Sequence, residues 1–416
     1  MTPEGWALRK LGDVATITSG GTPKVGRGDY YGGEIPFAKI EDVTSSPGLL
    51  ISETKTHITR KAVNETAAKV YPPGTVLVTM YGTIGEAAVT AIPMAANQAI
   101  AAFLDLKGVD RWYLAYMLQT LAPHFRRRAG QTTQANISGA VLKNFECRFP
   151  PLPEQVAIAT TLKAVDDAIA ASDAVIEQLD RVRKDIIADL LHHGLPRHAD
   201  VLRESEIGQV PAAWAIVPLG DLIEDGPTNG LYRPQDAYGE GVPIIRIDAF
   251  ANGDVVDITQ LRRLRITSSE AVPYRVGPGD IVINRVNSLS HLGKVGLVER
   301  VDETTVFESN MMRIRMNATR CVPRFAFLVL ASPLARDQLL RRAKLAVAQA
   351  SINQQDVKGV LVPLPPVDEQ KVIVNAVGAV TDRLSKERAV IAERRRVKVA
   401  LADALLTGRL RVRGAA

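Results

Sequence analysis

The chain has 416 residues, too many for one ordinary hydrophobic core, so we expect two or more domains. Its 46% hydrophobic and 23% charged residues are typical of a soluble globular protein, and a formal net charge of +6 favours a polyanionic partner without requiring one. The two cysteines, Cys147 and Cys321, lie far apart and outside any CxxC motif, which disfavours disulfides and thiolate metal sites. With no apolar signal region and no run of about 18 apolar residues, we expect a cytoplasmic protein.

The sequence contains an internal duplication. Five short blocks of the first half return in the same order in the second half. The matching ranges are 3–6 with 211–214, 11–14 with 219–222, 35–40 with 242–247, 73–78 with 278–283, and 149–155 with 364–370. Each copy begins with short strand-like runs, helical pieces and Gly/Pro turns, and ends in one long helical stretch. This arrangement predicts a compact α+β domain in each half.

Both copies reach their long helix through a Pro-Pro-x-x-Glu-Gln sequence. In both helices apolar residues recur at alternating spacings of three and four over four heptads, which is typical of a coiled-coil seam. The apolar seam positions are Leu162, Val165, Ile169, Ile176, Leu179, Ile186 and Leu190 in the first helix, and Val377, Val380, Leu384, Ile391, Leu401 and Leu405 in the second. The same frame also includes Ser172, Arg183, Glu387, Arg394 and Lys398.

The charges of the two helices predict how they pair. Residues 156–190 hold four basic and seven acidic residues, whereas residues 371–405 hold eight basic and four acidic residues. Parallel pairing would bring basic clusters of both helices together, and antiparallel pairing brings acid against base. We therefore expect an antiparallel coiled coil. The alternative is two separate amphipathic helices, each packed on its own domain.

Sequence motifs that would indicate catalysis are missing. We find no Asn-Pro-Pro-Tyr sequence of an amino-methyltransferase, no phosphate-binding P-loop and no zinc-hydrolase pattern. His192 and His193 close the first long helix and His198 comes soon after them. We expect no cysteine or carboxylate at ligand spacing nearby and interpret them as a solvated helix end rather than metal ligands. We expect a binding protein that is not an enzyme on its own and that holds neither a metal nor a cofactor.

With these features the sequence resembles the specificity subunit of type I restriction–modification enzymes. The resemblance rests on the Pro-x-x-Trp and Leu-Gly-Asp openings at Trp6 and Trp214, the two Pro-Pro-x-x-Glu-Gln sequences, and the Leu-Leu-Thr-Gly-Arg-Leu ending at 405–410. It implies target-recognition domains at 1–154 and 196–368, and conserved coiled-coil helices at 155–195 and 369–412. Each domain would read one half of a bipartite, asymmetric site in double-stranded DNA.

The resemblance also implies partners. Two modification (methyltransferase) subunits would dock on the helices, and restriction (endonuclease/translocase) subunits would join them. S-adenosylmethionine, ATP and Mg would then belong to those partner subunits, and no membrane would be involved.

Polar loops supply the residue types that reach base edges and phosphates. In the first copy the candidate DNA-binding residues are Lys24, Arg27, Tyr30, Tyr81, Thr83, Arg127, Gln131, Thr133, Gln134 and Asn136. In the second copy they are Asn229, Tyr232, Arg233, Arg285, Asn287, Ser288, His291, Lys294, Gln349, Ser351, Asn353 and Gln354. Glutamine-rich loops precede the Pro-Pro sequence in both copies, which strengthens their candidacy.

Other interpretations stay open. Polar loops can be merely solvated, and the basic run at 126–128 can be a helix C-terminal cap. The chain as a whole could be a protein-binding scaffold whose duplicated domains sit on a coiled-coil spacer, or a nuclease with an unrecognised active site.

Overall fold

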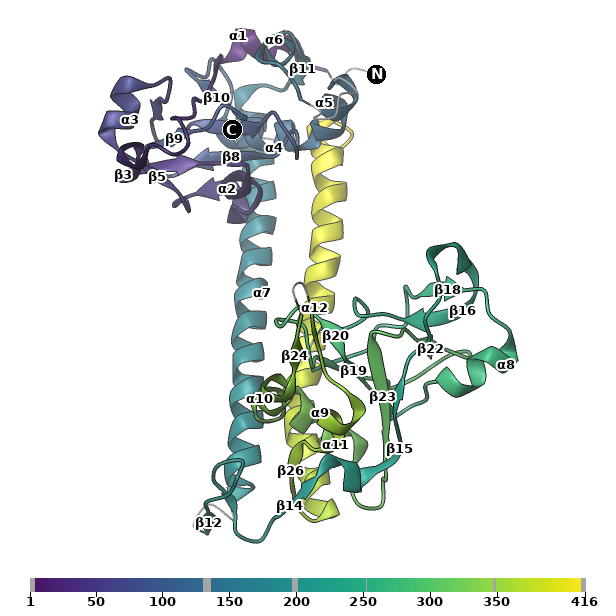
Figure 1. Cartoon of the computed structure of the whole chain (residues 1–416). Helices are drawn as coiled ribbons and strands as arrows, with labels where there is room; N and C mark the ends of the chain where they lie inside the picture. Colours follow the sequence, from purple (N-terminus) through teal and green to yellow (C-terminus); the bar gives the residue numbers. More distant parts are fainter. Residues whose placement is uncertain (1–3, 130–135, 197–200, 252, 347–348, 413–416) are drawn as a thin grey trace. The chain divides into compact units, whose positions relative to one another are not determined.

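The structure is a computed structural model that describes residues 4–129, 136–196, 201–251, 253–346 and 349–412. It consists of two compact units. Unit 1 comprises residues 1–176 and 387–416, and unit 2 comprises residues 177–386. Each unit therefore contains one α+β domain together with parts of both long helices, α7 (Leu152–His193) and α12 (Val367–Leu406) (Figure 1).

Unit 1 is built around a five-stranded sheet of order β2-β10-β7-β8-β4. Its strands are Thr16–Ser19, Ile100–Leu104, Val76–Thr79, Ala87–Thr90 and Leu50–Ile51. A four-stranded sheet, β5-β3-β9-β6, is formed by His57–Ile58, Tyr31–Ala38, Met94–Ala96 and Val70–Tyr71, and β1 (Ala7–Lys10) pairs with β11 (Glu146–Phe149). The helices are α1 (Leu11–Val14), α2 (Ile40–Thr44), α3 (Arg60–Glu65), α4 (Arg111–Thr120), α5 (Ala122–Arg128) and α6 (Gly139–Lys143), with 3₁₀ turns η1 (Gly28–Tyr30) and η2 (Pro47–Leu49).

Unit 2 repeats this plan. Its five-stranded sheet, β15-β23-β19-β21-β17, is formed by Ile223–Asn229, Met311–Met316, Ile281–Asn284, Val295–Leu297 and Asp254–Val255. The smaller sheets are β18-β16-β22 (Arg262–Leu264, Tyr238–Ile245, Val306–Phe307), β20-β25-β24 (Val286–Asn287, Ala350–Ser351, Lys344–Leu345), β14-β26 (Ala215–Pro218, Leu361–Leu364) and β12-β13 (Leu202–Arg203, Val210–Pro211). The helices are α8 (Ser268–Ala271), α9 (Pro323–Ala331), α10 (Pro333–Arg342) and α11 (Gln354–Lys358), with 3₁₀ turns η4 (Leu219–Leu222), η5 (Gln235–Ala237) and η6 (Val272–Tyr274).

The duplication extends to the strand register. In unit 1 β10 and β7 pair Ile100 with Thr79, and in unit 2 β23 and β19 pair Met311 with Asn284. Both central strands follow a Pro-Gly turn whose glycine, Gly74 or Gly279, has a φ near +80 to +90°, a left-handed conformation that glycine adopts without a steric penalty. The prediction of two duplicated α+β domains with two long helices is confirmed.

Each five-stranded sheet buries both faces. Val76 and Val78 of β7 pack in the main core of unit 1, which also contains residues of α4. Leu77 packs in a smaller core on the other face of the sheet. This alternation follows from the two-residue period of a strand, with apolar side chains at successive positions. The main core continues onto the long helices, through Leu162 and Leu405 in unit 1 and through residues such as Leu191 and Val377 in unit 2.

The long helices run antiparallel within unit 1. Lys398 of α12 pairs with Asp166 of α7, and Arg395 pairs with Asp173 further along α7, so the residue numbers rise along one helix as they fall along the other. None of the predicted seam residues, all of which the structure describes, is exposed. The antiparallel arrangement expected from the charges is therefore what the fold contains.

Polar residues in the seam frame make polar contacts. Arg394 donates to the carbonyl of Ala168 at 3.0 Å and to the hydroxyl of Ser172. In unit 2 the buried Arg183 donates to the carbonyl of Gly253 at 3.2 Å and pairs with Asp254 at 3.3 Å. These groups satisfy hydrogen bonds that apolar seam residues could not make.

In the part of the chain that the structure describes, no helix has both the length and the hydropathy that a membrane span requires.

Candidate nucleic-acid interface

In unit 1 the candidate loops meet at one end of the five-stranded sheet. This end is where β2 and β7 finish and where β8 and β10 begin. The amide of Met80 donates to the carbonyl of Ala99 at 2.7 Å, and the amide of Ile137 donates to the carbonyl of Met80 at 3.0 Å. Tyr81 and Asn136 form an isolated β-bridge. The bond between Met80 and Ile137 brings together loops that lie more than 50 residues apart in sequence.

The equivalent end of the sheet in unit 2 carries the same bonds. The amide of Arg285 donates to the carbonyl of Asn310 at 2.8 Å, and the amide of Ile352 donates to the carbonyl of Arg285 at 2.9 Å. Here the pairing is extended into the three-stranded sheet β20-β25-β24, in which Val286 pairs with Ser351 and Asn287 with Ala350. Both units thus expose a cluster of loops at the equivalent end of their five-stranded sheets.

Lys24, Arg27 and Tyr30 lie on the segment that follows β2. Lys24 is exposed, whereas Tyr30 is 7% exposed and donates its hydroxyl to Glu65 at 3.0 Å. The Arg27 guanidinium stacks on the Tyr30 ring, 4.6 Å from its centroid, and pairs with Asp29 at 2.7 Å. Hydrogen bonding from Arg27 holds the pKa of the Asp29 carboxyl well below its usual range. Arg27 and Tyr30 therefore already have intramolecular partners.

Three further candidates of unit 1 lie on the loops at this end of the sheet. Tyr81, Thr83 and Asn136 are exposed. Gln131, Thr133 and Gln134 lie outside the described residues.

In unit 2 Tyr232 is the most accessible aromatic candidate. This residue is 72% exposed, in the loop that follows β15. Asn229, the last residue of β15, is exposed too, and Arg233 pairs with Glu270 at 2.6 Å. An exposed tyrosine hydroxyl can hydrogen-bond to the phosphates of DNA.

The loop after β19 carries five candidates. Arg285 and Asn287 are half-buried, with an Arg285 guanidinium nitrogen donating to the carbonyl of Ser309 at 3.1 Å and the Asn287 side chain accepting from the amide of Ser288. His291 is exposed and its Nδ1 lies 3.1 Å from the Ser288 hydroxyl, and Lys294 is half-buried.

The last loop contains a residue with a clear structural role. Asn353 caps the N-terminus of α11, where its side chain accepts from the amides of Gln355 and Asp356 at 2.7 and 3.0 Å. Ser351 is half-buried in β25. Gln349 and Gln354 are exposed.

The basic ends of α5 and α10 occupy equivalent places. Arg127 is exposed, next to His124, and Arg341 is its exposed counterpart one residue before Arg342. Arg128 stacks 4.4 Å from the Phe145 ring and Arg342 donates to the carbonyl of Gly359, so both second arginines have structural partners. Arg341 is not among the residues predicted from the sequence, although the duplication identifies it once the helix ends are aligned.

The turn before β10 and β23 was missed as well. Gln98 in unit 1 and Asn310 in unit 2 are exposed in the turn that supplies the carbonyl acceptors at this edge. The sequence feature that predicts this turn is a short polar stretch at the same position in both copies, residues 97–99 and 308–310.

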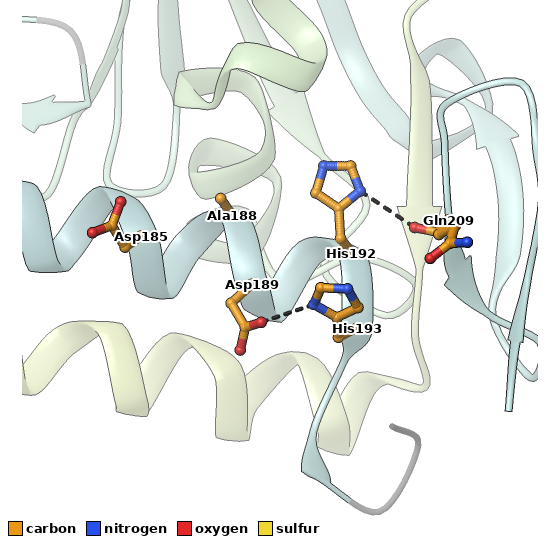
Figure 2. Close-up of a pocket in the computed structure, with 6 residues that line it drawn as sticks. All are labelled: Asp185, Ala188, Asp189, His192, His193 and Gln209. Atoms are coloured by element: carbon orange, nitrogen blue, oxygen red, sulfur yellow. Dashed lines mark hydrogen bonds and ion pairs between the residues drawn. The ribbon is translucent and has the colours of Figure 1, made fainter. Parts of the chain in front are cut away.

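A shallow pocket of unit 2 lies at the end of α7, where residues of the helix face Gln209 (Figure 2). His193 Nδ1 lies 2.8 Å from the Asp189 carboxylate, and His192 Nδ1 lies 3.3 Å from the carbonyl of Gln209. The expectation that no carboxylate stands near these histidines is wrong, since Asp189 lies one helical turn before His193. Within the described residues, however, no three His, Cys, Asp or Glu side chains form a group that could hold a metal ion.

Comparison with known proteins shows the family of this chain. The family model of the type I restriction modification DNA specificity domain matches residues 3–181 and again residues 211–393. The chain belongs to this family. The two matches correspond to the two copies of the sequence, so the resemblance that the repeated motifs indicated is confirmed, and the chain is a type I specificity subunit, a non-catalytic component.

Curated relatives and solved structures agree along nearly the whole chain. The MjaIX specificity subunit of Methanocaldococcus jannaschii is 23% identical, with 99% of this chain and 94% of the relative covered. The EcoKI specificity subunit of Escherichia coli K12 is 25% identical over 90% of this chain and 82% of the relative. The crystal structure of the S subunit from M. genitalium has the same fold, with a TM-score of 0.56 at 14% identity, covering 97% of this chain and 99% of that one.

Proposed function

We propose that this specificity subunit recognises a bipartite, asymmetric site in double-stranded DNA, with one half-site read by each copy. The observation that carries the proposal is the pair of equivalent loop clusters at the same end of both five-stranded sheets. The backbone bonds in the clusters are the same, while the side chains that they present differ. Two loop clusters with the same backbone arrangement and different side chains are suited to read two half-sites of different sequence.

The long helices would fix the distance between the half-sites and dock the partner subunits. We assign two modification subunits, which carry S-adenosylmethionine, and restriction subunits, which use ATP and Mg, as these partners. A solved structure with a TM-score of 0.54 comes from a study of complex assembly in the type I restriction–modification system, which supports a role in such a complex. We place the protein in the cytoplasm, where its two buried cysteines would stay reduced.

Selection from a random duplex library tests this function. The full-length chain, alone and with its modification subunits, should enrich two short conserved sequences separated by a gap of fixed length. Binding of the modification subunits without enrichment of any DNA sequence would instead favour the protein scaffold. DNA cleavage by the purified chain alone would favour a nuclease.

A further inference from the structure

A buried glutamine connects each recognition domain to the long helix that follows it. In unit 1 the side-chain oxygen of Gln155 accepts from the amide of Asp110 at 2.9 Å, and its nitrogen donates to the carbonyls of Gly108 and Pro150 at 3.2 and 2.8 Å. In unit 2 Gln370 accepts from the amide of Val322 at 2.7 Å. Its nitrogen donates to the carbonyls of Arg320 and Pro365 at 3.1 and 2.9 Å.

These two glutamines occupy the same place in both copies. Each stands in the first turn of its long helix, α7 or α12, and is the last residue of a Pro-Pro-x-x-Glu-Gln sequence. Each accepts from the N-cap residue of the domain's own helix, Asp110 for α4 and Val322 for α9. Gln155 is 1% exposed and Gln370 is 0% exposed, so neither side chain is available to a partner or to DNA.

The bonds differ in kind from the apolar contacts beside them. Apolar packing between domain and helix has no preferred direction, and it tolerates small rotations. A buried amide with both its oxygen and its nitrogen bonded to backbone groups permits one orientation, because rotation would leave polar groups unpaired away from water. These hydrogen bonds therefore fix the angle between the first turn of the domain helix, α4 or α9, and the first turn of the long helix that follows.

We propose that Gln155 and Gln370 are positioning residues for DNA recognition, which hold each domain at one angle on its helix and so restrict the spacer between the half-sites. The inference rests on the proposed function. One added base pair moves a half-site by about 3.4 Å along the duplex and rotates it by roughly 34°. A domain held at one angle loses affinity for DNA whose spacer is one base pair longer or shorter. A domain that can rotate on its helix keeps more of that affinity.

The test is a set of duplexes with both selected half-sites and a spacer varied one base pair at a time. The variants are Gln370→Met and Gln155→Met, which keep the side-chain volume and remove the hydrogen bonds. Gln338→Met is the matched control, because the side chain of buried Gln338 also makes three hydrogen bonds, to the carbonyl of Leu334 and to both backbone groups of Leu361, all inside the recognition domain. It loses comparable bonds and leaves the helix connection intact.

We expect either helix variant to lower the preference for the best spacer over its neighbours by about threefold or more, with the half-site sequences unchanged. Gln338→Met should lower the melting temperature and keep the spacer preference. An unchanged preference in folded Gln370→Met and Gln155→Met, or an equal loss in Gln338→Met, overturns the proposal. Should a Met variant not fold, Gln→Asn at the same position keeps the amide and shortens its reach.

A readout without DNA separates this proposal from the proposed function. Hydrogen exchange of the Val322 amide should rise in Gln370→Met and stay slow in Gln338→Met, whether or not the chain selects a DNA sequence. A parental chain that selects no sequence would contradict the proposed function. Slow Val322 exchange in Gln370→Met would contradict the positioning role.

Discussion

Lys398 of α12 and Asp166 of α7 form an ion pair in unit 1, with 2.6 Å between Nζ and Oδ1. The Asp166 side chain is 8% exposed, and its second oxygen accepts the hydroxyl of Tyr116 of α4 at 2.7 Å. The carboxylate is thus shared between the other long helix and the recognition domain. Burial together with this hydrogen bond raises the pKa of the Tyr116 hydroxyl far above its usual range, which keeps the hydroxyl protonated and donating.

Charge reversal at this contact should destabilise the helix pair. Lys398→Glu combined with Arg395→Glu places acid against Asp166 and Asp173, and we expect a loss of about 2–4 kcal/mol in the free energy of unfolding, mostly from the buried pair. Adding Asp166→Lys and Asp173→Lys should restore part of it, since the Tyr116 bond remains lost. Thermal or urea unfolding measures both effects.

Arg396→Glu is the control for that experiment. Arg396 pairs with Glu393 of its own helix and is largely exposed, so its reversal should change the stability by less than about 1 kcal/mol. Failure of the aspartate reversals to restore any stability would count against the pairing of these helices.

Tyr232 and Asn353 should behave differently although both were candidates for DNA contact. Tyr232→Ala removes an exposed ring, and we expect weaker DNA binding by about 1 kcal/mol or more with unchanged unfolding. Asn353→Ala removes the cap of α11, and we expect a loss of about 1 kcal/mol in stability. Binding titrations and melting curves on both variants distinguish the roles, and a destabilised Tyr232→Ala would assign that ring to the fold.

Arg127 and Arg341 are expected to contact phosphates. Replacing either with Ala should weaken binding evenly across DNA sequences and reduce the slope of log affinity against log salt by about 0.9. Arg342→Ala, which removes hydrogen bonds to the carbonyls of Gln338 and Gly359, is the matched control and should lower stability instead. A sequence-dependent loss in Arg341→Ala would mean that this arginine reads a base.

The sequence was sufficient to predict the elements whose pattern repeats. Seam positions such as Leu162 and Leu384 follow a helical period, and the duplicated blocks predict two α+β domains. The charges of the two helices also predict their direction, because opposite charges are concentrated over whole turns rather than at single residues.

Side-chain roles in the loops were harder to predict, for a physical reason. Asn353 is of a residue type that often contacts DNA, but its side chain caps the helix α11. Tyr30 is buried, and its hydroxyl donates a hydrogen bond to Glu65. Polar loop residues serve local hydrogen bonds and external ligands equally well, and only the backbone around them decides. Gln98 was not predicted because its place at the sheet edge depends on strand pairing between distant segments.

The length of the helices should set the spacer. Inserting one heptad into α7 near Ser172 and one into α12 near its contact Arg394 keeps the seam facing inward and adds roughly 10 Å. That equals about three base pairs at ~3.4 Å each. The rotation of about 100° that accompanies them should reduce affinity. Selection should return the same half-sites with a longer gap, and an unchanged gap would show that the helices do not measure DNA.

The most direct test of the central claim is a domain exchange. Residues 1–154 are replaced with the matching domain of another specificity subunit, and the DNA bound by the parent and by the chimera is selected and sequenced. Because each loop cluster lies within its own unit, we expect one half-site to change to that of the donor while the other stays the same. A chimera that alters both half-sites, or neither, would contradict the claim that each copy reads its own half of the site.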